Sequence, residues 1–265
     1  LPQLQLNGSL RDYKLLLDGS LTASDDTGHG NYRLDTPGLT LRHGQNQIQL
    51  TGAVDKDWQM AMNIAIPKLA QTINGANGEI SADLTLSGKR DTPQLKGMLE
   101  ANALQWQDAT LERLTLDTDL SLDSGQDLTT AVSLQASNGK YQQQSVDELS
   151  LTLNGTALRH QLTLQLASTE HNAGIDMTGS LKPGEYWQGT LISAQLDSLL
   201  GPWQLVDSTE LDYRFADARL TVQPHCWQQA PSSQLQPDDV SDSGVLPAEA
   251  CGLQAWSARF WGNSC

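Results

Sequence analysis

Few residues in this sequence have the types and spacing that catalysis requires. The five histidines are scattered, and none forms the His-Glu-x-x-His pattern of zinc proteases. No Gly-x-Ser-x-Gly nucleophile elbow is present. His225 and Cys226 could ligate a metal, but no second pair of ligands accompanies them. The acidic run at 238–244 lacks the spacing and the closing Glu of a calcium loop. We therefore predict that the protein is not an enzyme and has no cofactor and no metal site.

The cysteines are the other reactive side chains. Cys226, Cys251 and Cys265 are the only three, and they form no Cys-x-x-Cys motif. An odd number leaves at least one thiol unpaired within the chain. Cys226 and Cys251 could form a disulfide in an oxidising compartment, or both could remain thiols.

The composition excludes several classes of partner. The chain has 265 residues, a formal net charge of −15 and a pI near 4.5. Such a chain is repelled by nucleic acid and by an anionic membrane surface. The sequence contains no apolar run of 18 residues and does not begin with a signal peptide. We expect it to be an interior piece of a longer protein, with any export signal or membrane anchor outside it.

Apolar residues at every second position dominate the chain. In "LERLTLDTDLSLD" (111–123), Leu114, Leu116, Leu120 and Leu122 alternate with Thr, Asp and Ser. This period predicts a half-buried β-strand. The same alternation recurs at 15–21, 48–54, 60–66, 80–86, 95–103, 132–136, 149–153, 162–166 and 175–181.

Helical signals are limited to two short breaks, at 67–73 and 197–203. Neither is long enough for a crossover between parallel strands, so we predict an antiparallel sheet. The stretch 111–119 resembles 146–154, which stands 35 residues later. Such repetition is typical of elongated arrays. We predict a β-repeat region over 1–222 and an irregular, Pro/Ser/Asp-rich, Trp-containing tail over 223–265.

Glycines occur in two patterns. Asx-Gly dipeptides, such as those at 18–19, 74–75 and 154–155, close tight turns or lie inside strands. The glycines within 50–54, 86–90, 95–99 and 177–181 fall in phase with the apolar face, as a curving sheet would require.

The purpose of the apolar face is the main functional question. Two sheets could pack their Leu rows into a closed sandwich core. Alternatively, one curled sheet could line a groove that shelters lipid tails, at about 0.8 kcal/mol per buried CH₂. Composition alone favours the core, whereas the in-phase glycines and the presence of only two Phe favour the groove. The predicted groove-lining residues are Ile48, Leu50, Met62, Ile64, Leu84, Leu86, Leu99, Leu114, Leu116, Leu134, Leu149, Leu151, Leu162, Leu164, Ile175 and Met177.

The order of these signals resembles a known family. Between residues 43 and 120, a strand ending in Gly is followed by a Trp-containing strand, a short turn, a "G-x-l-x-a-x-l-x-l-x-G" pattern and a "P-x-l-x-G-x-l" pattern. These positions are Gly52, Trp58, Leu69, Gly78, Leu84, Leu86, Gly88, Pro93, Leu95, Gly97 and Leu99. The stretches 187–205 and 224–227 fit the same resemblance, which extends over about residues 1–230. The pattern resembles the TamB family of AsmA-like, inner-membrane-anchored envelope proteins. One departure concerns the tail, where the family tends to place a second Cys about ten residues after the Cys of "HCW" and this chain has Leu235-Gln236.

The resemblance implies a U-shaped β-groove with an apolar interior that spans the Gram-negative periplasm. It also implies phospholipid as cargo, an outer-membrane barrel partner of the Omp85 type, and a role in outer-membrane protein and autotransporter assembly. The inner-membrane anchor and the part that meets the barrel would lie outside this chain. Two alternatives remain, a β-rich scaffold for protein secretion that uses open strand edges, and a β-solenoid or sandwich from a surface adhesin.

Overall fold

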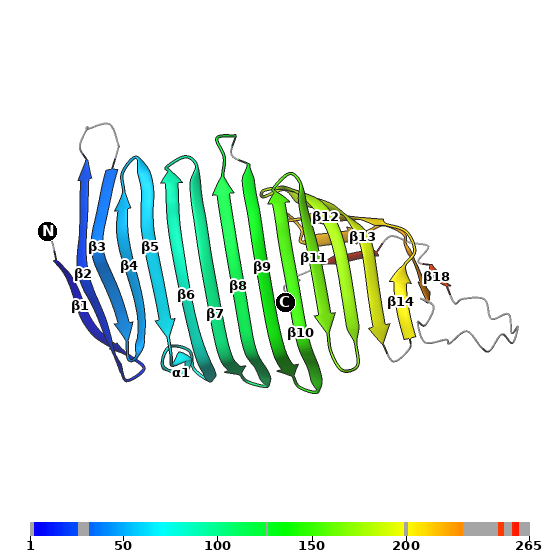
Figure 1. Cartoon of the computed structure of the whole chain (residues 1–265), viewed down its shortest axis with the longest axis horizontal. Coiled ribbons are helices and arrows are strands. Elements are labelled where there is room, and N and C mark those ends of the chain that lie inside the picture. Colours follow the sequence, from blue (N-terminus) through cyan, green and yellow to red (C-terminus); the bar gives the residue numbers. More distant parts are fainter. Residues whose placement is uncertain are drawn as a thin grey trace, which may run out of the picture. The chain divides into compact units, whose positions relative to one another are not determined.

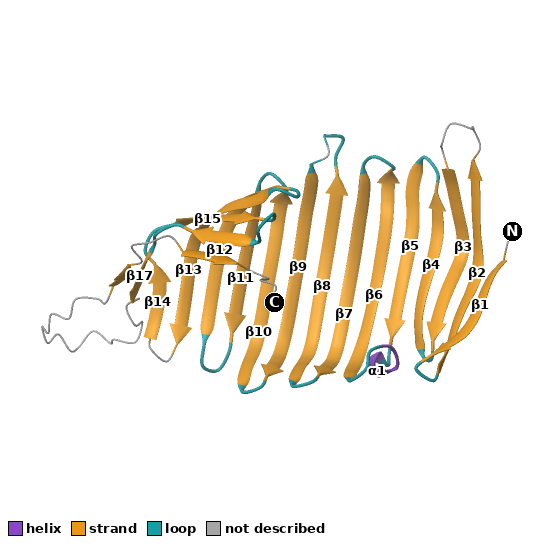
Figure 2. Cartoon of the chain, turned by 180° about the vertical axis from the view of Figure 1, so that it is seen from behind, coloured by secondary structure: helices purple, strands orange, loops and turns teal. Residues whose placement is uncertain are grey.

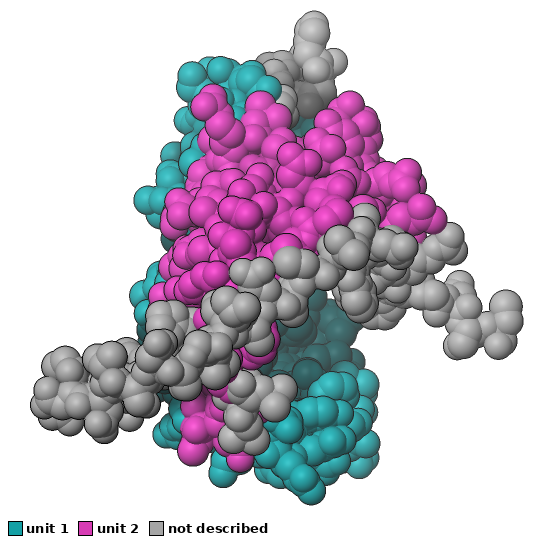
Figure 3. All heavy atoms as spheres, turned by 90° about the vertical axis from the view of Figure 1, so that its right-hand side faces the viewer, with its two compact units in different colours: residues 1–148 teal, residues 149–265 magenta. Residues whose placement is uncertain are grey.

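The computed structural model is all-β and antiparallel, as the sequence predicts (Figure 1). It describes residues 3–25, 32–125, 127–198, 201–229, 249–251 and 256–259. The chain divides into two compact units, 1–148 and 149–265, and the boundary falls within β10 (Gln144–Thr156) (Figure 3). The only helix in the described part has four residues, so no helix there is long and apolar enough to cross a membrane.

Unit 1 is a single layer of strands that follow one another in chain order (Figures 1 and 2). Each strand pairs antiparallel with the next, from β1 through β9. The strands are β1 (Gln3–Leu10), β2 (Tyr13–Asp25), β3 (Tyr32–His43), β4 (Asn46–Val54), β5 (Asp57–Ile66), β6 (Ala76–Lys89), β7 (Pro93–Trp106), β8 (Ala109–Leu122) and β9 (Leu128–Tyr141).

Unit 2 has shorter strands and a branched pairing pattern. β13 pairs with β12, β14 and β15, while β16 pairs with β15 and β19, and β17 pairs with β14 and β18. The strands are β11 (His160–Ala167), β12 (Asn172–Lys182), β13 (Tyr186–Ser198), β14 (Gly201–Leu205), β15 (Thr209–Arg214), β16 (Arg219–Val222), β17 (Cys226–Gln229), β18 (Glu249–Cys251) and β19 (Trp256–Arg259). The last three lie beyond residue 222, where the sequence predicts the tail, and most other tail residues lie outside the described residues.

The predicted helical turn at 67–73 is present as α1 (Leu69–Thr72), which is docked by a polar cluster. Buried Asn46 donates through Nδ2 to the Lys68 carbonyl at 2.9 Å and to Thr72 Oγ1 at 2.8 Å. Its Oδ1 accepts the Lys68 N–H at 3.1 Å. Buried His43 contacts Thr72 Oγ1 through Nδ1 and the Leu10 carbonyl through Nε2, at 3.2 and 2.9 Å. These bonds tie α1 to the ends of β1, β3 and β4. The second predicted break, 197–203, includes residues 199 and 200, which lie outside the described residues.

Most of the Asx-Gly dipeptides lie inside strands rather than in turns. Gly75 is in a turn, whereas Gly19, Gly78 and Gly155 lie within β2, β6 and β10 with φ of 148°, 113° and 125°. The in-phase glycines of the second pattern also lie within strands, as at Gly52 of β4. Positive φ, which glycine adopts without steric cost, is therefore used here to bend or bulge strands.

Candidate functional site

A continuous row of apolar side chains crosses unit 1, with one residue from each strand. Each member lies directly opposite the next, and opposite residues on antiparallel strands point to the same face. This central row consists of Leu6, Leu17, Leu41, Ile48, Ile64, Ala82, Leu99, Leu116 and Leu134. The register shifts of unit 1 fall away from these positions, so the row continues from β1 to β9.

Parallel rows flank the central row on the same face. In one, Leu50 lies opposite Met62, and Met62 lies opposite Leu84. Leu86 and Leu114 belong to two further rows. All ten predicted lining residues of unit 1 are thus brought together on one face, which we call the apolar face of unit 1.

Unit 2 repeats this arrangement on a smaller scale. Leu162 lies opposite Met177 and Leu164 opposite Ile175, which places four predicted lining residues on one face. That face continues onto β13 through Leu191 and Ala194. The last two predicted residues, Leu149 and Leu151, alternate with polar residues along β10.

Burial distinguishes this face from a closed core. All sixteen predicted lining residues are half-buried. Large apolar side chains in a closed core are most often fully buried. The fully buried apolar residues of the described part are Val54, Leu69, Ala76, Ala82, Ala101 and Ala194. Four of these six are alanines. The large Leu, Ile and Met side chains of the predicted lining are absent from this set, because each keeps some exposed surface.

The opposite face is polar and hydrogen-bonded. On β5, exposed residues such as Gln59 and Asn63 alternate with half-buried apolar ones. Lys96 Nζ lies 3.1 Å from an Asp119 carboxylate oxygen. A hydrogen bond from Gln94, followed by the Lys96 ammonium, lowers the pKa of Asp119. Charged side chains on this face favour its exposure to solvent.

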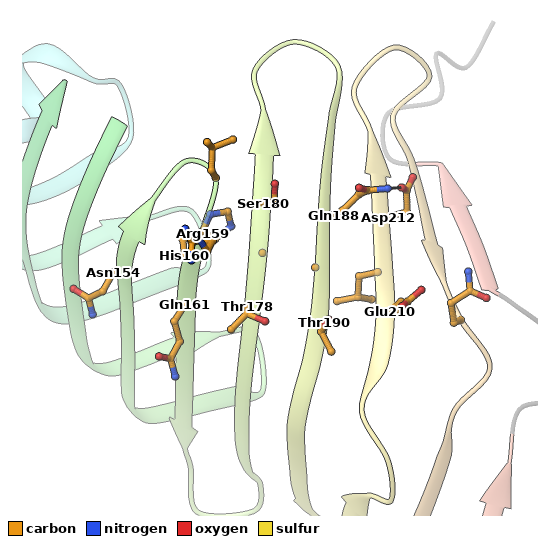
Figure 4. A pocket seen from close by; sticks show the side chains of 15 residues that line it. Asn154, Arg159, His160, Gln161, Thr178, Ser180, Gln188, Thr190, Glu210 and Asp212 are labelled. Atoms are coloured by element: carbon orange, nitrogen blue, oxygen red, sulfur yellow. Dashed lines mark hydrogen bonds between the residues drawn. The ribbon is translucent and has the colours of Figure 1, made fainter. Parts of the chain in front are cut away.

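Unit 2 also contains an open hollow of about 860 Å³ (Figure 4). Gln161, Thr178, Thr190 and Glu210 form a polar row across β11, β12, β13 and β15 at this site. Gln188 Nε2 donates to Asp212 Oδ2 at 2.9 Å. These groups offer hydrogen bonds to a polar ligand. The described residues contain no group of His, Cys, Asp and Glu that could hold a metal ion.

The cysteine prediction is only partly addressed by the structure. Cys226 is disulfide-bonded, and Cys226 of β17 is placed opposite Cys251 of β18. The pairing of these two cysteines stays a prediction.

Comparison with known proteins decides the family. The family model described as "TamB, N-terminal domain" matches residues 1–236. The chain belongs to the TamB family. It is also 24% identical over 267 residues to the "Translocation and assembly module subunit TamB" of Haemophilus influenzae. That alignment covers 99% of this chain and 19% of the relative, so the chain spans about a fifth of the relative's length. No solved structure gives a significant match.

The TamB-like sequence pattern has a structural counterpart in the register. Trp58 lies opposite Val54 on one side and Gly88 on the other. Its indole N–H donates to the Arg90 carbonyl at 3.4 Å. Gly97 lies opposite Leu84. The recurring Trp and Gly positions of the pattern are thus neighbours across strands.

Two groups of residues on the apolar face were missed from the sequence. Leu6, Leu17 and Leu41 extend the central row onto β1–β3, although the alternation there is visible in the sequence. His160 and Trp187 also belong to the unit 2 face, but their contact joins residues 27 apart and no local pattern signals it.

Proposed function

We propose that this chain is a segment of a lipid conduit in the Gram-negative envelope. The observation that carries the proposal is the central row, which presents one apolar side chain from every strand of β1 to β9. Seven of its nine members are half-buried Leu or Ile residues: Leu17, Leu41, Ile48, Ile64, Leu99, Leu116 and Leu134. Family membership adds support, since the curated relative is named as a subunit of a translocation and assembly module.

The mechanism is passive. Phospholipid acyl chains lie along the apolar face of a sheet that is curled into a U-shaped groove, and the headgroups remain in water. Each CH₂ removed from water contributes about 0.8 kcal/mol, and the contacts require no specific geometry. An acyl chain can therefore move along the rows without a single tight binding site that would retain it.

The remaining parts of the proposal concern the whole protein. We place it in the periplasm, held by an inner-membrane anchor outside this chain, with phospholipid as cargo and an Omp85-type outer-membrane barrel as partner. Its role is outer-membrane biogenesis, including assembly of outer-membrane proteins and autotransporters. It acts as a transport and assembly component and not as an enzyme.

The test is a charge placed on the apolar face of the full-length protein. Leu116→Asp should reduce phospholipid delivery to the outer membrane strongly, because an ionised carboxylate in an acyl-chain path is costly to desolvate. The matched control is Thr110→Asp on the same strand, where Thr110 is exposed and lies opposite Lys140. Protease resistance would verify that both variants fold. Loss of folding in Leu116→Asp would indicate a closed core, and normal delivery by a folded Leu116→Asp protein would also contradict the proposal.

A further inference from the structure

The indole of Trp187 lies across the backbone of two neighbouring strands in unit 2. Gly179 of β12 and Gly189 of β13 lie opposite one another. A Cβ at Gly179 would stand 2.6 Å from Trp187 Nε1, and a Cβ at Gly189 would stand 2.6 Å from Trp187 Cζ2. Since real Cβ atoms do not approach other atoms this closely, both positions require glycine while the ring stays in this place. One side of the indole therefore rests on bare backbone.

His160 binds the indole N–H of this ring. The Trp187 indole N–H donates to His160 Nε2 at 2.7 Å, and an indole nitrogen can only donate. Nε2 must therefore carry no proton. The other ring nitrogen, Nδ1, lies 3.2 Å from the Thr156 carbonyl oxygen, which can only accept. A neutral imidazole with its proton on Nδ1 satisfies both partners, whereas an imidazolium would present an N–H toward the indole N–H.

The ring lies on the apolar face. His160, Gly179 and Gly189 share one register row. The next row toward the interior of these strands contains Leu162, Met177 and Leu191. On the other side, Tyr213 of β15 lies opposite Trp187. The indole thus continues the apolar surface across two positions where the sheet has no side chain.

We propose that Trp187 is an acyl-chain contact on the apolar face of unit 2, and that His160 is the positioning residue that keeps its indole flat against the sheet. This inference rests on the proposed function. An indole that lies flat supplies apolar surface without projecting far from the sheet. An acyl chain that contacts Leu162 and Met177 can therefore continue over it. A ring released from His160 is free to rotate away from the two glycines and obstruct the same path.

The positioning role is tested without lipid. Tryptophan in the 265-residue chain is replaced by 5-fluorotryptophan, and the fluorine resonance lost in Trp187→Phe identifies residue 187. We expect this resonance to shift in His160→Leu, which has no acceptor for the indole N–H. In His160→Gln, whose amide oxygen still accepts, it should stay near its wild-type position. An unchanged resonance in His160→Leu, or the same shift in His160→Gln, would overturn the positioning role.

The lipid contact is tested in cells with the full-length protein. A photoreactive phenylalanine at Tyr213, beside Trp187, should crosslink phospholipid, as should one at Leu164 away from the ring. In His160→Leu the yield at Tyr213 should fall several-fold, with recovery in His160→Gln and no change at Leu164. Lipid at Leu164 with none at Tyr213, or a Tyr213 yield indifferent to His160→Leu, would overturn this inference and leave the proposed function standing. Lipid at neither position would count against both.

Discussion

Gly97 of β7 lies directly opposite Leu84 of β6, and the Leu84 Cδ2 methyl occupies the place that a side chain at position 97 would need. Thr118 Cγ2 stands 3.3 Å from the same place. The row that contains Leu50, Met62 and Leu84 therefore continues onto β7, because the Leu84 side chain covers Gly97.

This packing predicts a coupled pair. Gly97→Ala should destabilise the protein by roughly 1 kcal/mol, because overpacking forces Leu84 from its preferred position. In a Leu84→Ala background the space is free, so the added cost of Gly97→Ala should disappear. Urea unfolding of the two single variants and the double variant measures the coupling. Additive effects would mean that the methyl group of Leu84 does not fill this space.

The polar cluster that holds α1 against the sheet predicts that loss of Asn46 destabilises this part of the protein. Asn46→Ala removes three hydrogen bonds from a buried side chain and leaves the Lys68 carbonyl without that donor. We expect a cost of about 1–3 kcal/mol and faster hydrogen exchange at the Ile73 N–H, which bonds to the Leu69 carbonyl. The control is Asn63→Ala, which removes one exposed bond to Asp83. Equal effects of the two variants would argue against a specific role for the polar cluster.

A disulfide between Cys226 and Cys251 is predicted from their placement on β17 and β18. Non-reducing peptide mapping of the oxidised protein should recover the peptides of these two cysteines as one linked species, with Cys265 alkylated. Cys251→Ser should release Cys226 to alkylation. A linked Cys226–Cys265 species would contradict this pairing.

The lowered pKa of Asp119 predicts a specific pH dependence. Because the Gln94 hydrogen bond and then Lys96 hold the folded-state pKa below its ordinary value of 3.8, ionised Asp119 stabilises the folded state above that pH. This stabilisation should be lost as the pH falls through the lowered pKa. Asp119→Asn should therefore be less stable than wild type near pH 7, and the difference should shrink toward pH 2. The effect is small since the pair is exposed. A difference that grows on acidification would have the wrong sign.

The strands were predictable because their signal is local. A period of two needs only the order of apolar and polar residues, so Leu114 and Leu116 identify both the strand and its inward face. The Asx-Gly dipeptides were harder to interpret. Positive φ at Gly19 or Gly155 serves equally well in a turn or a bulge, and the choice depends on the partner strand.

Contacts between distant strands could not be predicted in this way. No local sequence pattern near His43 predicts its contact with Thr72, and none near Trp187 predicts its hydrogen bond to His160. Both depend on register, which the chain sets through pairing over many residues. The order of the Gly, Trp and Pro signals nevertheless identified the family, because that order reflects how successive strands pair.

The most direct test of the conduit is photocrosslinking in cells. A photoreactive residue is placed in the full-length protein at Leu116 on the apolar face, with Asp117 on the opposite face of the same strand as the control. The test extends to unit 2 with photoreactive residues at Leu151 and Leu164, and with Thr152 as the control. The account predicts phospholipid attached at the Leu positions and none at the controls. Crosslinks to protein alone, or lipid in equal amounts at Leu116 and Asp117, would contradict it.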